Sequence, residues 1–387
     1  MGGLGLRSTE KHSSAAFVAS QSACRELCLK LDPSYSLNLF DGQNDTNLAR
    51  LDYNMKVTSD EALQENLESC PRQQTLSQNI DNSTLKNIRN NFSNDIRYQA
   101  HLNHTTVSGA GSWLHVTPSK ALGTHVDPQL YRTMIQRRLR APIHDVEFHC
   151  PYCDDIVDRY GDHCLTCACG GDRTRRHNLL RNEVYHQCHS AGLNPELERP
   201  GLLQARPLVG ASMENGTSRS QNVNRRPADV YLPRWRRGVP AALDFAVTSG
   251  LCSNIISRSA LDGTIATVEY EITKRNHLDT ETKCLENGIT FIPMICEADG
   301  GGWGPAAHKV WSVLAKQKAI IAGEQDSTIV GRLLQTLGLI LHKENARAIL
   351  RRFPRGFDHD SSELLAASVD CSTSADAYPS DIYPNET

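Results

Sequence analysis

The sequence contains no run of eighteen consecutive apolar residues, so we expect no transmembrane helix. Its first residues lack the long apolar core of a secretory signal peptide. The 13 cysteines are an odd number, which argues against a complete framework of paired disulfides. Together these absences predict an intracellular protein in a reducing compartment, without a membrane partner and with some cysteines held as metal thiolates.

The chain also lacks the excess of positive charge that favours binding to nucleic acid. Its 41 Lys and Arg residues face 44 Asp and Glu residues, for a formal net charge of -3. Any attraction to nucleic acid must therefore come from local basic patches. Each basic run alone is also typical of a solvated surface cluster. The candidate runs are residues 137–140, 173–176, 225–226 and 234–237.

The two ends of the chain carry few signs of a packed domain. Residues 1 to 110 are polar and rich in Asn, Ser and Gln, and their short apolar stretches do not add up to an independent core. We expect a partly helical, partly disordered region over 1–115 and a helical linker over 116–146. The acidic, Ser-rich residues 354–387 are typical of a disordered tail.

The segment between residues 176 and 353 has the order helix, strand, strand, helix, strand, helix, helix, which is an α/β pattern. Alternating or clustered apolar residues predict its strands at 228–232, 241–248 and 289–295. Apolar residues at helical spacing predict its helices at 176–192, 258–277, 306–322 and 328–353.

A dense group of cysteines predicts a metal-organised loop over residues 147–175. Tetrahedral zinc needs four soft or borderline ligands, commonly a Cys-x2-Cys hook and a second pair. The preferred ligands are Cys150, Cys153, His163 and Cys167. Cys169 and Cys164 remain rivals for the fourth place, and a cluster of free cysteines is the alternative without metal. The segment is poor in apolar residues, so we expect it to need zinc to hold one structure.

Two aspartates lie on adjacent expected strands that are joined by a short turn. A hairpin can bring the carboxylates of Asp229 and Asp244 together, as a catalytic Mg²⁺ or Mn²⁺ site requires. Asp244 lies in an otherwise apolar strand, where a charge is unfavourable without a partner or a metal. Lys274 is expected to reach the site from the following helix. The alternative is an ordinary strand-end Asp that caps a turn or pairs with Arg226.

These motifs together resemble the C-terminal region of non-LTR retrotransposon polyproteins, in which a zinc knuckle precedes a restriction-like endonuclease. The family pattern is a Cys-Cys-His-Cys knuckle, an Arg-His-Asn step, an Arg/Lys-Pro-Asp motif and a second Asp. The matching positions are Cys150, Cys153, His163 and Cys167, then 176–178, then 226–229, then Asp244. The stretch 270–274 is similar to the one that carries the family's Lys. The resemblance covers most of the chain and is weakest over residues 20–110.

The resemblance implies a PD-(D/E)XK nuclease core, which nicks target DNA so that the freed 3′-hydroxyl primes reverse transcription of the element's RNA. It implies that Asp229 and Asp244 bind Mg²⁺ or Mn²⁺ and that Lys274 assists them. The residues implied in nucleic-acid contact are Arg176, His177 and Arg226. For His177, support of the zinc site or an ordinary surface position remains open. DNA and element RNA are the implied partners, in the nucleus.

Three departures from the family pattern limit what the resemblance implies. Ala228 separates Pro227 from Asp229, the spacing from His163 to Cys167 leaves the fourth zinc ligand open, and the chain has no Tyr/Phe-x-Asp-Asp polymerase motif. We therefore expect the tail region of a reverse transcriptase and not a complete polymerase. The first hypothesis is a metal-dependent DNA endonuclease, the second a catalytically inactive nucleic-acid-binding remnant, and the third a zinc-stabilised structural protein.

Overall fold

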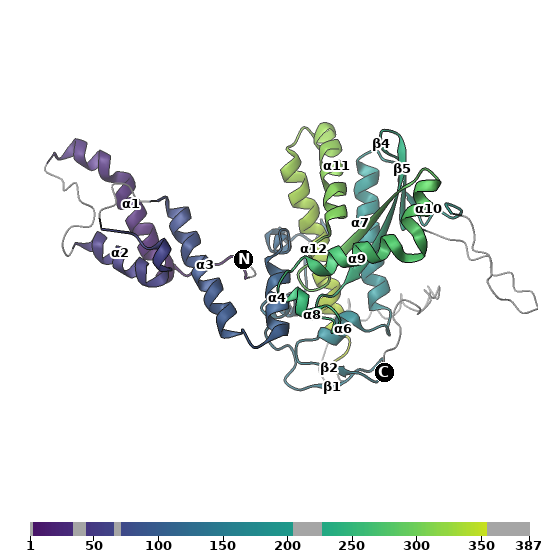
Figure 1. The fold of residues 1–387 in the computed structure, drawn as a ribbon, viewed down its shortest axis with the longest axis horizontal. Coiled ribbons are helices and arrows are strands. Elements are labelled where there is room, and N and C mark those ends of the chain that lie inside the picture. Colours follow the sequence, from purple (N-terminus) through teal and green to yellow (C-terminus); the bar gives the residue numbers. More distant parts are fainter. Residues whose placement is uncertain (1–2, 34–43, 66–70, 204–226, 354–387) are drawn as a thin grey trace, which may run out of the picture. The chain divides into compact units, whose positions relative to one another are not determined.

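The protein divides into two compact units, one over residues 3–99 and the other beginning at Ala100. The computed structural model describes residues 3–33, 44–65, 71–203 and 227–353 (Figure 1). The boundary between the units thus lies earlier than the expected one at residue 115. The expected tail over 354–387 lies outside the described residues. Within the described parts, no helix is both long and apolar enough to cross a membrane.

The first unit has an apolar core of its own. Its helices are α1 (Thr9–Leu31), α2 (Asp45–Lys56) and α3 (Gln73–Asn91), with a short 3₁₀ turn, η1, at Ser59–Glu61. The core combines small residues of α1, such as Ala15, with larger ones from α2 and α3, such as Tyr53 and Leu76. The expectation that this region forms no core was wrong. Its apolar residues are sparse along the sequence, but three helices bring them together.

The second unit is a mixed α/β fold around a four-stranded sheet of order β3-β4-β5-β6. The strands are β3 (Glu196–Leu197), β4 (Val230–Arg236), β5 (Val239–Thr248) and β6 (Thr290–Glu297). β4 and β5 form an antiparallel hairpin, and β6 runs parallel to β5. A parallel connection needs a long crossover. Here the crossover contains α8 (Ile256–Ser259), α9 (Ile265–Asn276), η3 (His277–Asp279) and α10 (Thr280–Glu286). The α/β prediction is confirmed, and its three expected strands correspond to β4, β5 and β6.

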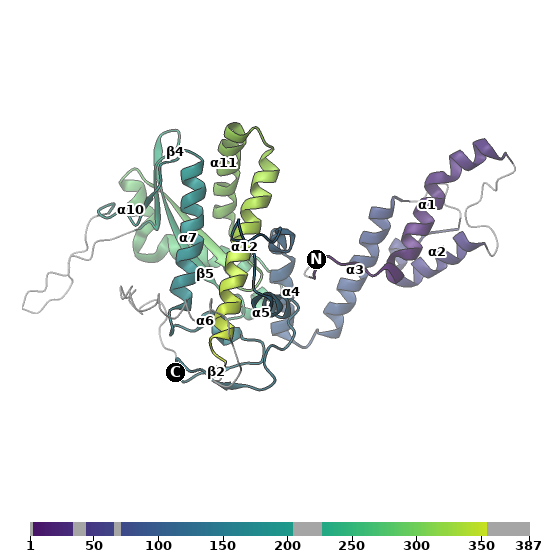
Figure 2. The same ribbon diagram turned by 180° about the vertical axis from the view of Figure 1, so that it is seen from behind.

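Helices cover both faces of this sheet (Figures 1 and 2). One face packs against α7 (Asp172–Ser190), α11 (Pro305–Ala322) and α12 (Asp326–Leu350), where Leu243 is part of the largest apolar cluster. On the other face Ala242 packs with Cys284 of α10, and α9 lies against β6. Successive side chains of a strand point to opposite faces. Asp244 therefore shares the face of Ala242, on the side of α9.

The segment before the sheet is part of the second unit's core. It contains the end of α4 (Ile96–Thr106), the 3₁₀ turn η2 (Ser112–His115) and α5 (Pro128–Arg138). Leu130 and Met134 of α5 pack with Trp113 and with residues of α12. Residues 116–146 were expected to be a linker. Their apolar helix face instead packs against α12, which the helical periodicity alone did not specify.

The cysteine-rich segment is also docked on this core. It consists of the small sheet β1 (Phe148–His149) and β2 (Ile156–Val157) and the one-turn helix α6 (Asp162–Thr166). Val157 and Leu165 pack with Ile349 of α12. Gly161 has a left-handed φ of 74°, and a Cβ there would lie 2.9 Å from the Ile349 side chain. This glycine therefore permits both the turn into α6 and the close approach to α12.

Candidate functional site

Three cysteines and one histidine form a cluster that can bind a metal ion. The ligand atoms of Cys150, Cys153, His163 and Cys167 all lie within 4.8 Å of one another. The Cys153 Sγ atom is 3.3 Å from His163 Nε2 and 3.6 Å from Cys167 Sγ. Tetrahedral zinc with Zn–S bonds of about 2.3 Å separates two sulfurs by about 3.8 Å. The cluster is therefore compatible with zinc, and it contains the four preferred ligands.

Local structure explains why these four residues meet. Cys150 follows β1, and its N–H donates to Asp155 O at 2.9 Å, which closes the turn that carries Cys153. The N–H of His163 donates to Asp158 Oδ2 at 2.9 Å, which fixes the start of α6. The two rivals for the fourth place differ: Cys164 is buried in the apolar contact with α12, and Cys169 is exposed. Only Cys167 of these three lies within reach of the other ligands.

Cys150 and Cys164, both buried, differ in the pKa of their thiols. Burial alone would raise the pKa of Cys150, but hydrogen bonds from the Tyr152 backbone and from His163 lower this pKa to about 6. Burial raises the pKa of Cys164 well above its usual value, and no comparable set of bonds opposes it. A metal ligand must be a thiolate. The environment thus favours the thiolate of Cys150 and the neutral thiol of Cys164, while burial and the neighbouring sulfurs raise the pKa of Cys153 to about 12.

We expect the purified protein to hold about one zinc ion per chain and Cys153→Ser to lose most of it, because one of four tetrahedral ligands is removed. Mass-spectrometric metal analysis after exhaustive dialysis measures both. Cys169→Ser is the matched control, since it removes a nearby thiol that lies outside the cluster. A wild-type protein without zinc, or equal zinc in the two variants, would contradict the assignment.

The two aspartates lie near each other beside the start of β4. Val230, the first residue of β4, pairs with Leu243 of β5, so Asp229 directly precedes the hairpin and Asp244 follows its first pair. The Asp229 N–H donates to Leu243 O at 2.9 Å, and the Asp229 carboxylate accepts from the Phe245 N–H at 2.6 Å. The Asp229 carboxylate thus lies beside the backbone that follows Asp244, close enough for its charge to help raise the pKa of Asp244.

Two basic side chains complete this carboxylate site. Lys274 of α9 places its Nζ atom 3.0 Å from Asp244 Oδ2. His177 of α7 places its Nε2 atom 3.1 Å from Asp229 Oδ2. The three residues expected in catalysis thus lie together. Of the open interpretations of His177, a ligand of the zinc cluster is excluded, because its imidazole is bonded to Asp229.

The pKa values of the two neighbouring carboxyl groups are shifted in opposite directions. Burial raises the pKa of Asp244, and the adjacent negative charge of Asp229 adds to this effect, which Lys274 only partly offsets. Burial also acts to raise the pKa of Asp229, but the bonds from His177 and from the Phe245 N–H lower it overall. Pairs of acids whose environments separate their pKa values are typical of functional sites.

The geometry alone does not assign a catalytic metal to these carboxylates. Among the described residues, two groups contain three or more His, Cys, Asp or Glu ligands within 4.8 Å of one another, and neither includes Asp229 or Asp244. The chain offers two acidic ligands here, and Lys274 already contacts one of them. Further ligands for a divalent cation would have to come from water or substrate.

The structure removes one of the expected nucleic-acid contacts, Arg176, from the surface. Arg176 is buried, and its guanidinium donates to Asn345 Oδ1 at 2.6 Å and to Leu165 O at 2.9 Å. It therefore joins α7 to α12 and to the cysteine-rich segment, and the expectation of a phosphate contact was wrong. Arg226 lies outside the described residues. His177 is partly buried at the carboxylate site.

The second group of potential metal ligands, which the sequence did not reveal, is a buried charge cluster beyond the ends of β5 and β6. It contains His104, Glu297 and Asp299, each 1% exposed. Glu297 accepts hydrogen bonds from the backbone N–H groups of Asp299 and Gly300, at 2.9 and 2.6 Å. Asp299 accepts from Arg137 and, at 3.0 Å, from the Ser249 hydroxyl. Its carboxylates already have strong partners, so we interpret this cluster as structural.

The search for related proteins gave no further guidance on this site. No family model and no curated protein matches the chain.

Proposed function

We propose that this chain is a metal-dependent DNA endonuclease with a PD-(D/E)XK-type core and a zinc knuckle, similar to the endonuclease of non-LTR retrotransposons. The observation that carries the proposal is the carboxylate site: Asp229 lies close enough to Asp244 for their charges to interact, and Lys274 contacts Asp244 at 3.0 Å. Three residues identified by motif order, which lie up to 45 positions apart, meet at one place in the fold. A chance set of solvated surface charges would have no reason to do so.

The donor set suits a magnesium or manganese ion, since both prefer carboxylate oxygens and retain water ligands. A bound ion of this kind would supply Lewis-acid activation of water and neutralisation of phosphate charge. Asp229 is held ionised by His177 and by the Phe245 N–H, and Asp244 is held close to it. Lys274 supplies a fixed positive charge next to Asp244, where it can stabilise charge that develops on the scissile phosphate.

The zinc knuckle has a separate role in this proposal. It is docked on α12 by Val157 and Leu165, and Arg176 ties it to α7, the helix that carries His177. Zinc there would stabilise the fold locally and position the exposed part of the knuckle beside bound DNA. Element RNA is a second expected partner of the same surface.

Nicking of supercoiled plasmid by the purified protein tests the proposal. We expect nicking in Mg²⁺ or Mn²⁺ by the wild type and none by the Asp229→Ala/Asp244→Ala variant, because both acidic ligands are lost. Asp262→Ala/Asp279→Ala is the matched control; it removes two carboxylates of the same unit that lie outside the site. Equal nicking by the two double variants would indicate a contaminating nuclease and would overturn the proposal.

A catalytically inactive nucleic-acid-binding protein is the second candidate. One observation favours it: the direct Lys274–Asp244 ion pair occupies a carboxylate that a metal would need. This candidate predicts DNA binding by the wild type without nicking under any divalent metal. The plasmid assay combined with a DNA-binding measurement therefore separates the two candidates.

A further inference from the structure

The four basic runs of the sequence differ in how far the fold buries or pairs their side chains. In the first, Arg137, Arg138 and Arg140 are buried. In the second, Arg176 is buried and Arg175 pairs with Glu344 at 3.0 Å. The third lies outside the described residues. The fourth run, residues 234–237, stays exposed at the turn between β4 and β5, except for its Trp235 ring.

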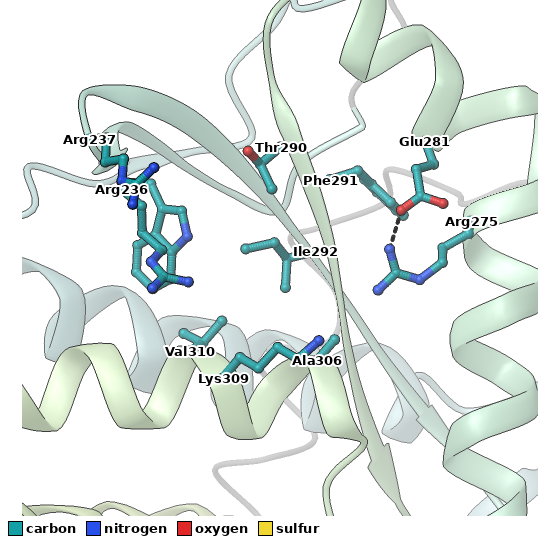
Figure 3. A pocket seen from close by; sticks show the side chains of 11 residues that line it. Arg236, Arg237, Arg275, Glu281, Thr290, Phe291, Ile292, Ala306, Lys309 and Val310 are labelled. Carbon is teal, nitrogen blue, oxygen red and sulfur yellow. Dashed lines mark hydrogen bonds and ion pairs between the residues drawn. The ribbon is translucent and has the colours of Figure 1, made fainter.

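This exposed run lines a pocket of about 600 Å³ at the edge of the sheet. Figure 3 shows Arg236 and Arg237 on one side of the pocket and Arg275 with Glu281 on the opposite side. Lys309 of α11 forms a further wall. The pocket thus collects four cations from three separate parts of the chain: the β4–β5 turn, α9 and α11.

The charges in the pocket are only partly balanced by the protein: the carboxyl group of Glu271 of α9 lies near enough to Arg275 and Lys309 for their charges to act on its pKa. Glu281 is its only acidic lining residue, and it already pairs with Arg275. The side chains of Arg236, Arg237 and Lys309 make no hydrogen bond or ion pair with any residue that the structure describes. Ordinary surface cations are dispersed, whereas here three unpaired cations surround one concavity. Such a site has the electrostatic complement of a ligand with several negative charges.

The floor of the pocket is the free edge of β6. This strand ends the order β3-β4-β5-β6, so its outer edge at Thr290–Ile292 has no partner strand among the described residues. Pro293, the next residue, is paired with Asp244 on β5. Neighbouring strands lie about 4.8 Å apart. The pocket therefore begins close to the proposed catalytic carboxylates, and Arg275 directly follows Lys274 on α9.

We infer that this pocket binds the sugar–phosphate backbone of the DNA on which the carboxylate site acts, an inference that rests on the proposed function. Its cations come from three elements, which suits consecutive phosphates along a strand better than one compact anion. Phosphate contacts fix the register of a protein on DNA without reading its sequence. The pocket thus positions the scissile strand, and it confers affinity that depends strongly on salt.

Fluorescence anisotropy with a labelled 30-bp duplex, titrated without divalent metal from 50 to 200 mM salt, tests the inference. The pocket variant is Arg236→Gln/Arg237→Gln/Lys309→Gln. Loss of three phosphate contacts should reduce the slope of log affinity against log salt by about 2–3 and weaken binding at low salt by more than about tenfold. The control, Lys120→Gln/Arg132→Gln/Lys316→Gln, removes the same charge from exposed positions outside the pocket.

The outcomes distinguish this inference from the proposed function. Weakened DNA binding by the pocket variant alone supports the inference. Equal binding by both triple variants, whether retained or reduced, overturns it, because net charge would then explain any change. If the pocket variant alone loses affinity for DNA but the wild type nicks no plasmid, the DNA-binding role of the pocket is supported and the endonuclease proposal fails. A wild type that does not bind the duplex overturns both.

Discussion

Arg137→Met is expected to destabilise the second unit by about 3–5 kcal/mol, the effect of removing one partner from a buried ion pair. Arg137 is 3% exposed, and its guanidinium pairs with both Asp162 and Asp299. It also donates to Tyr160 O at 2.9 Å. Methionine fills a similar volume but leaves the Asp299 carboxylate buried with no arginine beside it. Urea unfolding followed by circular dichroism measures the loss.

The pH dependence of this effect has a defined sign. In the wild type burial acts to raise the pKa of Asp299, but Arg137, together with His101, His104 and Glu297, lowers it overall. The stabilising contribution of this carboxylate is therefore present above the carboxyl's unfolded pKa and is lost only at strongly acidic pH. In the variant, burial without the cation raises this pKa, so the folded state gains a proton as the pH falls. The stability gap between wild type and variant should therefore narrow from pH 7 towards pH 4. A constant gap would contradict the argument.

Arg132→Met is the matched control for this variant. Arg132 lies on the same helix, α5, but its side chain is exposed. Changes of exposed residues away from special features usually alter stability by less than about 0.5 kcal/mol. A similar loss in both variants would show that the buried ion pairs of Arg137 contribute nothing specific.

Arg137 also shows where reasoning from the sequence fails. A cluster of arginines suggests a surface patch, because isolated charges are rarely buried. Here the acids that neutralise Arg137 are 25 and 162 positions away, at Asp162 and Asp299. Only the fold brings them together, so no local pattern could separate this buried run from the exposed run at 234–237. The same reason explains Arg176, whose partners Leu165 and Asn345 lie 11 and 169 positions away in the sequence.

Features set by local spacing were easier to predict. The strands β4, β5 and β6 follow from short apolar segments between turns, and the short connection made the β4–β5 hairpin predictable. That hairpin was enough to bring Asp229, directly before β4, near Asp244 of β5. The fourth metal ligand was not decidable from spacing, since Cys164, Cys167 and Cys169 all lie near His163 in sequence. The α6 turn decides it by burying Cys164 and leaving Cys169 exposed.

Lys274→Met is expected to lower the nicking rate by about 10²–10³-fold, as does removal of one preorganised electrostatic group in other enzymes. Its ammonium group is the only cation that the structure places on Asp244 among the described residues, at 3.0 Å. Methionine preserves the aliphatic packing of the side chain against the sheet. Initial rates of plasmid nicking measure the effect, with Lys316→Met, an exposed lysine of α11, as the control.

The pH profile separates an electrostatic role of Lys274 from a structural one. Burial and the neighbouring Asp229 already raise the pKa of Asp244, and Lys274 opposes them. Without the lysine this pKa rises further, so the carboxylate is protonated over a wider acidic range and residual nicking should need higher pH. Lys274→Arg restores a positive charge and should return the acidic limb towards the wild-type position without recovering the full rate, because its planar guanidinium places charge differently.

A nicking rate of Lys274→Met above that of the wild type would reverse the catalytic role assigned to Lys274. The lysine would then act as a block that neutralises Asp244 in place of a metal, as the inactive-remnant hypothesis requires. An unchanged rate with an unchanged pH profile would instead remove Lys274 from the site's chemistry altogether. Since the same ion pair is a catalytic arrangement in one hypothesis and an inhibitory one in the other, the sign of this single effect distinguishes them.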